Sequence, residues 1–192
     1  DYTMSLKSII VFCLCLNSLT GTANPLIPPE DPRESITYWK PHIIQPGSNK
    51  QVARAHKVYE QLLRAWDSQR VAPGLGVVKS EAGPWAAALA DGHILLSQAA
   101  IEICFKLKHK NADDLLAFII AHELAHQRAN DLWHFKFLRL AGSQAQSVRT
   151  QMLAGIDLDA QAFSDLERRE AQADHSGIVL MATAGFDPYQ IL

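Results

Sequence analysis

The sequence predicts an α+β fold that is mostly helical and contains a small sheet. Three observations lead to this prediction: an amphipathic stretch over residues 52–66, a hairpin signal at Asp91-Gly92, and a long apolar helix over Asn111–Arg128. Apolar residues spaced three and four apart indicate helix, whereas short apolar runs joined by Asp-Gly indicate paired strands. The chain has 192 residues, 48% of them hydrophobic and 20% charged, so it can bury a core and is not of a disordered type.

Two amphipathic helices are predicted on either side of the strands. Apolar side chains recur at helical spacing between residues 52 and 66, and Val71-Ala72-Pro73-Gly74 ends the run. Residues 99–108 form a shorter candidate, with lysines near its end, where the helix dipole favours positive charge. Cys104 has apolar neighbours in this segment, so we expect a buried thiol.

Short apolar runs predict strands in the intervening segment. Leu75–Lys79 is bounded by glycine, and Trp85–Ala90 and His93–Ser97 flank Asp91-Gly92. Asp-Gly between two such runs is a hairpin signal, because these residues tolerate the positive φ angles of a tight turn. The last two runs are therefore predicted to pair with each other.

The most strongly helical segment is Asn111–Arg128. Asn111 can cap this helix, and Asp113 and Asp114 fall in its first turn, where negative charge is favoured. Apolar side chains then cover nearly every side of the segment. This pattern predicts a central helix that is buried in the core.

A final helix is predicted near the C-terminus. Its start is indicated by Ser164-Asp165-Leu166-Glu167, a capping-box pattern, and its end by Gly185. The mixed stretch 133–162 before it is interpreted as helical, with a loose section around Gly142-Ser143.

Residues 1–23 have the layout of a secretory signal peptide. A short basic region follows Met4, which we take as the start, and the apolar run Ser8–Leu16 precedes small residues that end at Ala23, the expected cleavage site. The apolar run is shorter than the roughly 20 residues that a bilayer span needs. We therefore expect an exported protein, periplasmic or secreted, without a membrane span once the signal is removed.

The rest of the chain divides into two parts. Residues 24–46 are rich in proline and predict an extended tether or wrapping segment, whereas residues 47–192 form the main domain. The net charge is −2, the pI is about 6.5, and no stripe of lysine and arginine occurs. These charges disfavour a nucleic-acid partner.

The segment His122-Glu123-Leu124-Ala125-His126 carries the strongest chemical signal. Histidines four apart share one helix face, with Cβ atoms about 5–6 Å apart, so both imidazoles can bind one metal ion. Glu123 cannot point at the same ion, but it can reach a water molecule at an open metal position and act as general base. Without a partner, a glutamate and two histidines in so apolar a helix would be costly to bury. A structural zinc site would normally recruit cysteines.

A catalytic zinc needs a third protein ligand. A glycine and a third histidine after the motif are excluded, because Arg128 and Leu132 occupy their positions. The last helix offers Glu167, Glu170 and Asp174. Glu170 and Asp174 share one face, so one can bind the metal while the other accepts a hydrogen bond from a ligand imidazole. We favour Glu170, since Glu167 belongs to the capping box.

These motifs together resemble the gluzincin peptidases of the HtpX, CAAX-prenyl-endopeptidase and BepA type. The resemblance covers roughly residues 51–188 and rests on the zinc-helix motif, on Glu170-Ala171-Gln172-Ala173-Asp174-His175-Ser176-Gly177 and on Ala184-Gly185-Phe186-Asp187-Pro188. It implies a zincin-like fold with a small sheet beside the zinc helix. It also implies one Zn²⁺ per chain, with Asp174 supporting a ligand histidine; the implied ligands are His122, His126 and Glu170.

The segment Trp85–Ile94 is similar to the strand that lies along the cleft in this family. The resemblance therefore implies that residues near its end pair with an extended substrate by adding it to the sheet. The residues expected to do so are Gly92, His93 and Ile94.

Several positions depart from the family pattern. Gln172 replaces its second glutamate, which is not the ligand, and Asp131 lies near the place of a histidine that commonly follows the zinc helix. The usual asparagine of the strand motif is absent. The chain ends at Leu192, whereas relatives can supply a transition-state-stabilising side chain from later sequence. Either His93, His134 or His175 takes that role, or the chain is a fragment, or its activity is low.

The favoured interpretation is a zinc endopeptidase of the exported compartment. Its partners would be unfolded or misassembled polypeptides, as in protein quality control of the cell envelope. The alternative is a zinc-containing chaperone-like protein, or a binding protein with weak catalysis, that holds unfolded chains along the strand near His93.

Overall fold

The computed structural model describes residues 32–66, 72–79, 83–106, 112–129 and 160–191. The predicted signal peptide, the cap at Asn111, the candidate His134 and nearly all of the mixed stretch 133–162 lie outside these residues. Within them, no helix is both long enough and apolar enough to cross a membrane.

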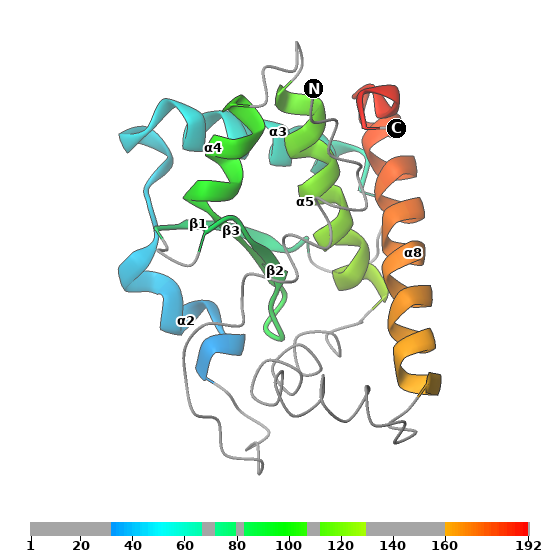
Figure 1. The fold of residues 1–192 in the computed structure, drawn as a ribbon. Helices are drawn as coiled ribbons and strands as arrows, with labels where there is room; N and C mark the ends of the chain where they lie inside the picture. Colours follow the sequence, from blue (N-terminus) through cyan, green and yellow to red (C-terminus); the bar gives the residue numbers. More distant parts are fainter. Residues whose placement is uncertain (1–31, 67–71, 80–82, 107–111, 130–159, 192) are drawn as a thin grey trace.

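Within the described residues, the predicted helices and strands are present with shifts in their ends, so the α+β fold is confirmed (Figure 1). The long helices are α3 (Lys50–Arg64), α4 (Gln98–Lys106), α5 (Ala112–Ala129) and α8 (Ala160–Thr183). The strands are β1 (Gly74–Val78), β2 (Ala86–Ala88) and β3 (His93–Ser97). Cys104 in α4 is buried, as predicted, and its thiol donates to the carbonyl of Ala100.

The sheet has the order β1-β3-β2, with β3 parallel to β1 and antiparallel to β2. The predicted hairpin is formed by β2 and β3. Among the described strands, β2 therefore has a neighbour on one side only. Trp85 O and Leu89 N bond to β3, and the bonding direction alternates along a strand. The backbone N–H and C=O groups of Ala86 and Ala88 thus point away from β3; Ala86 is partly exposed and Ala88 is buried.

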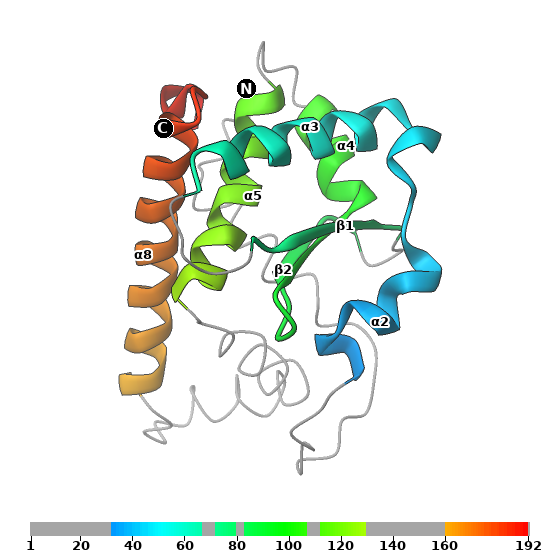
Figure 2. The same ribbon diagram turned by 180° about the vertical axis from the view of Figure 1, so that it is seen from behind.

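Two apolar clusters cover the two faces of the sheet. Ile94 and Leu96 of β3 belong to the main core, together with residues of α3, α4, α5 and α8. Leu95 points to the opposite face, where it packs with Val78 and Trp85. Helix α3 crosses one side of the sheet while α2 (Ile36–Trp39) lies on the other (Figure 2).

The proline-rich segment wraps the outer face of the sheet, but it is not extended as predicted. Its described part forms short helical turns: η2 (Pro32–Glu34), α2, η3 (Lys40–His42) and η4 (Pro46–Ser48). Proline fixes φ near its helical value and suits the first positions of such turns. Ile36, Trp39 and Ile43 pack against the outer cluster, and Ile43 pairs with Val78 at the edge of β1. The segment thus contributes to the core.

Helix α8 begins earlier than predicted. It starts at Ala160, so Ser164-Asp165-Leu166-Glu167 lies inside the helix and is not its cap. The preceding residues, which include two alanines and a glutamine, favour helix and allow it to extend towards the N-terminus. The other end is as predicted: Gly185 has φ +88°, and the amide of Phe186 bonds to Met181 O across the helix end.

Candidate active site

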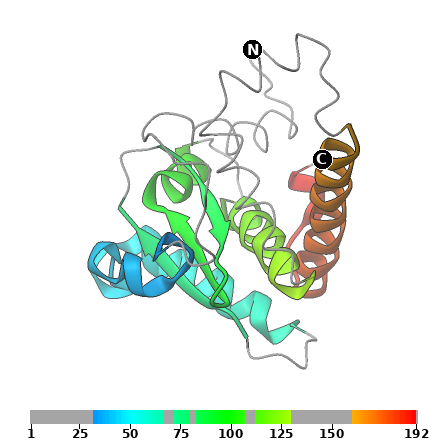
Figure 3. The same cartoon turned by 90° about the horizontal axis from the view of Figure 1, so that it is seen from below.

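Helix α5 presents the two histidines from the centre of the molecule. It lies between the sheet and α8 (Figure 3), so most of its side chains are buried. The side chain of His126 is 1% exposed and that of His122 is 12% exposed. Because the two residues are four apart, their rings stand one above the other, with centroids 4.7 Å apart.

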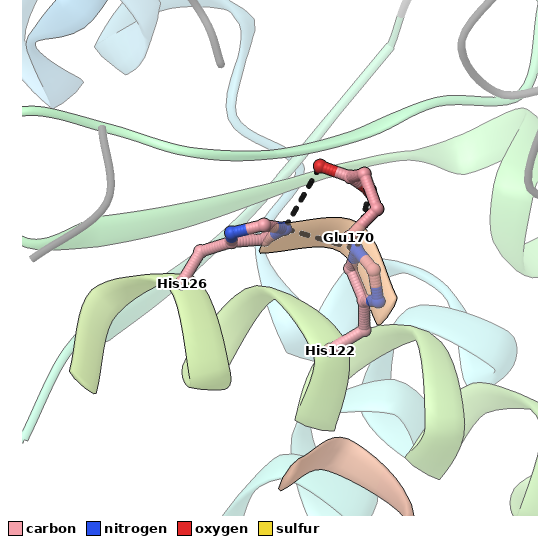
Figure 4. Close-up of side chains that lie close together, drawn as sticks. All are labelled: His122, His126 and Glu170. Atoms are coloured by element: carbon pink, nitrogen blue, oxygen red, sulfur yellow. Dashed lines mark hydrogen bonds and ion pairs between the residues drawn. The ribbon is translucent and has the colours of Figure 1, made fainter. Parts of the chain in front are cut away.

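Helix α8 brings Glu170 to both histidines (Figure 4). The two Nε2 atoms of His122 and His126 lie 3.0 Å apart. Glu170 Oε2 is 3.4 Å from His122 Nε2, and Glu170 Oε1 is 3.5 Å from His126 Nε2. This is the one group of three or more potential metal-binding side chains found within the described residues.

The spacing of these donor atoms fits a zinc ion. Ligands that bind tetrahedral zinc at about 2.0–2.1 Å are separated from one another by roughly 3.3–3.4 Å. The separations here, from 3.0 to 3.5 Å, bracket that value. Two imidazole nitrogens and a carboxylate are also the donor set of many catalytic zinc sites, which leave a fourth position open. His122, His126 and Glu170 can therefore hold Zn²⁺ without rearrangement of the helices.

Asp174 orients one of the two rings. Its Oδ1 lies 2.9 Å from Nδ1 of His122. An Nδ1–H that donates to this carboxylate leaves the lone pair on Nε2, the atom that faces Glu170. The contact therefore selects the tautomer that a metal ion needs.

The site carries an excess of negative charge. Burial alone lowers the pKa of His122, but neighbouring carboxylates outweigh it and raise the pKa to about 10. Asp174 and Glu170 act through hydrogen bonds, and Glu123 and Glu170 act through their charges. Without a metal, the imidazole consequently holds a proton at neutral pH. A divalent cation would displace that proton and neutralise the same carboxylates.

Glu123 is an acidic side chain of α5 that is buried next to His122. It is 6% exposed, and it does not belong to the metal-binding group. Its charge acts on His122, so its carboxylate lies within electrostatic reach of the site. A group next to the metal donors that does not itself bind the metal has the placement required of a general base.

Gly177 allows α8 to approach the backbone of α5. A Cβ atom at this position would lie 3.0 Å from His122 N and 3.2 Å from the carbonyl carbon of Ala121. Both neighbours are backbone atoms, which cannot move aside as a flexible side chain can. Gly177 follows Glu170 and Asp174 on α8, so this close approach keeps both carboxylates against His122. The sequence motif contains Gly177, but the motif alone did not reveal this role.

Replacing Gly177 by alanine is therefore expected to push α8 away from α5. We expect a loss of stability of about 1–3 kcal/mol, as for other overpacked sites, together with weaker zinc binding. Urea unfolding and zinc titration would measure the two effects. Ala182→Gly, at an exposed position of α8, is the control: it should lower stability through helix propensity alone and leave zinc affinity unchanged. Wild-type zinc affinity in Gly177→Ala would contradict the proposed packing role.

The structure places Gly92, His93 and Ile94, which are expected to pair with substrate, in the hairpin turn and in the central strand of the sheet. Gly92 lies in the turn, and His93 and Ile94 belong to β3, which is already paired with β1 and β2. Among the described strands, β2, the first strand of the same hairpin, is paired on one side only.

Two of the three histidines considered for transition-state stabilisation, His93 and His175, lie within the described residues. His93 lies on the same face of β3 as Leu95, which belongs to the outer cluster, and its Nδ1 is 2.9 Å from Asp91 Oδ1. It therefore faces away from α5. His175 is exposed on α8. Glu167 is also exposed and does not join the metal-binding group.

Comparison with known families agrees with this geometry. The sequence model of peptidase family M48 matches residues 49–192, most of the chain. The chain belongs to peptidase family M48. Members of family M48 are zinc metallopeptidases, so the protein is a hydrolase that acts on peptide bonds of polypeptide substrates. Comparison with curated proteins finds no match. The matched region begins after residues 32–48, the described part of the proline-rich segment (here called the wrapping segment). This segment nevertheless packs against the sheet of the matched region.

Proposed function

We propose that this M48 peptidase is an endopeptidase that binds one zinc ion per chain and degrades unfolded or misassembled proteins after export. The observation that carries the proposal is the convergence of His122, His126 and Glu170 at zinc-like spacing, with Glu123 buried beside them. The edge strand β2 contacts the zinc helix α5 and supplies a binding surface for an extended chain.

Each residue of the site has a role in this proposal. His122, His126 and Glu170 would hold the metal, and Asp174 fixes the tautomer of His122. Zinc, when bound, polarises the substrate carbonyl and lowers the pKa of the attacking water. Glu123 accepts a proton from that water as its oxygen bonds to the carbonyl carbon. When the C–N bond breaks, Glu123 returns the proton to the departing amine nitrogen.

The free edge of β2 favours substrates in an extended conformation. Ala86, which is partly exposed, can exchange backbone hydrogen bonds with a peptide that lies along this edge, as in other cases of strand addition, whereas Ala88 is buried. The side chains of β2 are all alanines, which offer little to discriminate among sequences. Recognition through the backbone demands an unfolded segment and tolerates varied side chains, as a quality-control peptidase requires.

The proposed compartment rests on the N-terminal sequence. The basic region, apolar run and small residues that end at Ala23 have the layout of an export signal. Microscopy or fractionation of cells that express the full chain with a C-terminal tag would test export. Recovery of an uncleaved protein from the cytoplasm alone would contradict it.

The activity is tested by incubating the zinc-loaded protein with a reduced, unfolded protein and with the same protein in its folded form. We expect internal cleavage of the unfolded form, inhibition by a chelator and recovery on addition of zinc. Fragments trimmed from one end only would indicate an exopeptidase instead. Binding of the unfolded protein without any cleavage would favour the chaperone-like alternative.

A further inference from the structure

The turn of the β2–β3 hairpin is attached to the zinc helix by one side chain. Gln127 follows His126 on α5 and is partly buried. Its Nε2 lies 2.8 Å from Leu89 O and 3.1 Å from His93 O. One amide group thus donates to two backbone carbonyls of the hairpin.

These two carbonyls are the ones that close the turn. Leu89 O also accepts from the amide of Gly92, at 3.1 Å, and His93 O accepts from the amide of Leu89, at 2.7 Å. Gly92 has φ +88°, a backbone conformation that glycine adopts readily. The Gln127 amide therefore holds the turn at both of its closing hydrogen bonds.

The turn is also fixed from the side of the wrapping segment. Asp91 Oδ2 accepts from the backbone amide of Ile36 at 2.6 Å, and Asp91 Oδ1 accepts from the amide of His93 at 3.2 Å. Asp91 joins the turn to the segment before the M48 region, and Gln127 joins it to the zinc helix. A large shift of the turn relative to α5 would break both bonds of Gln127.

We propose that Gln127 is a positioning residue that sets the distance between the edge of β2 and the metal-binding residues. The inference rests on the proposed function, because it assumes that substrate lies along β2. Leu89 directly follows the last residue of β2, and Gln127 directly follows a metal-binding histidine, so this contact joins the end of the edge strand to the zinc helix next to the site. A peptide paired with β2 can reach the metal-binding residues without losing part of its binding to β2 only if this distance is kept.

The test compares Gln127→Met, which keeps the length of the side chain but removes both donors, with Gln127→Glu, which places oxygen atoms against the two carbonyls. Gln61→Met is the matched control. Gln61 is also partly buried, and its Nε2 donates to a backbone carbonyl, Ala184 O, at 2.8 Å. That bond joins α3 to the end of α8 and does not involve the hairpin.

Each variant is assayed with two substrates, a peptide long enough to cover β2 and a short blocked dipeptide that spans only the cleaved bond. For both Gln127 variants we expect kcat/KM on the long peptide to fall about tenfold or more, mainly through KM, with a smaller change on the short substrate. Zinc content should equal that of the wild type. Amide hydrogen exchange at Leu89 and Gly92 should become faster, with or without zinc.

The inference is overturned if both substrates lose the same factor, if Gln61→Met shows the same dependence on substrate length, or if the Gln127 variants lose zinc. These outcomes differ from failure of the proposed function, in which the zinc-loaded wild type would cleave neither substrate. In that case the inference would fail with it.

Discussion

Replacing Glu123 by glutamine is expected to lower kcat/KM for peptide hydrolysis by about 10²- to 10⁴-fold, the usual contribution of a general base. The amide has nearly the shape of the carboxylate but cannot take a proton from water. Glu123 is outside the group of side chains that can hold the metal, so zinc binding should persist. Steady-state kinetics on an internally quenched peptide, together with metal analysis of the same sample, would measure both quantities.

The control for this variant is Glu102→Gln on α4, where Glu102 accepts a hydrogen bond from Gln98. This change should leave both hydrolysis and zinc content at the wild-type level. A Glu123→Gln protein that cleaves peptides at the wild-type rate would exclude Glu123 as the base. Loss of zinc from the Glu123→Gln protein would mean that Glu123 contributes to metal binding.

Replacing Glu170 by glutamine is expected to release the metal. His122 and His126 would remain as donors from the described site, and an amide is a weaker ligand than a carboxylate. We expect zinc affinity to fall by more than the roughly 10- to 100-fold that is typical when a residue supporting a ligand is lost. Hydrolysis at limiting zinc should fall with it. Competition with a chromophoric chelator would give the affinity, and thermal unfolding with and without zinc would give the stabilisation that the metal provides.

Two further variants make this prediction specific. Glu167→Gln changes an exposed glutamate on the same helix and should bind zinc like the wild type. Asp174→Asn weakens the contact with His122 Nδ1. Its zinc affinity should lie between those of Glu167→Gln and Glu170→Gln, about 10- to 100-fold below the wild type. If Glu170→Gln bound zinc as tightly as the wild type, the third ligand would have to be another residue.

Local patterns predicted most of the helices and strands. The spacing of apolar residues identified α3 and the buried helix α5, and Asp91-Gly92 identified the hairpin, because these signals depend on neighbours within one or two turns of chain. The start of α8 was wrong for a related reason. A capping-box pattern caps a helix only where the helix begins. Here the helix already includes the residues before Ser164, so the pattern lies inside it.

The edge of the sheet could not be predicted in this way. A hairpin motif states that two strands pair, but it does not state which of them receives a third strand. The pairing of β1 with β3 joins segments separated by β2, so β3 becomes central and β2 remains at the edge. Because of this non-local pairing, we propose that substrate pairs with β2 and not with His93 and Ile94 of β3.

The features of the site likewise fall into those that local sequence predicts and those that depend on tertiary packing. The alignment of His122 with His126, and the place of Glu123 between them, follow from the geometry of a single helix and were already contained in the sequence. The distance from Glu170 to those histidines depends on how closely two helices pack, and Gly177 permits that approach only because it meets the backbone of α5. The attachment of the hairpin turn by Gln127 likewise requires the folded chain, since its donor and acceptors are far apart in sequence. Periodicity along the chain thus determined which residues share a face, and tertiary packing decided which faces meet.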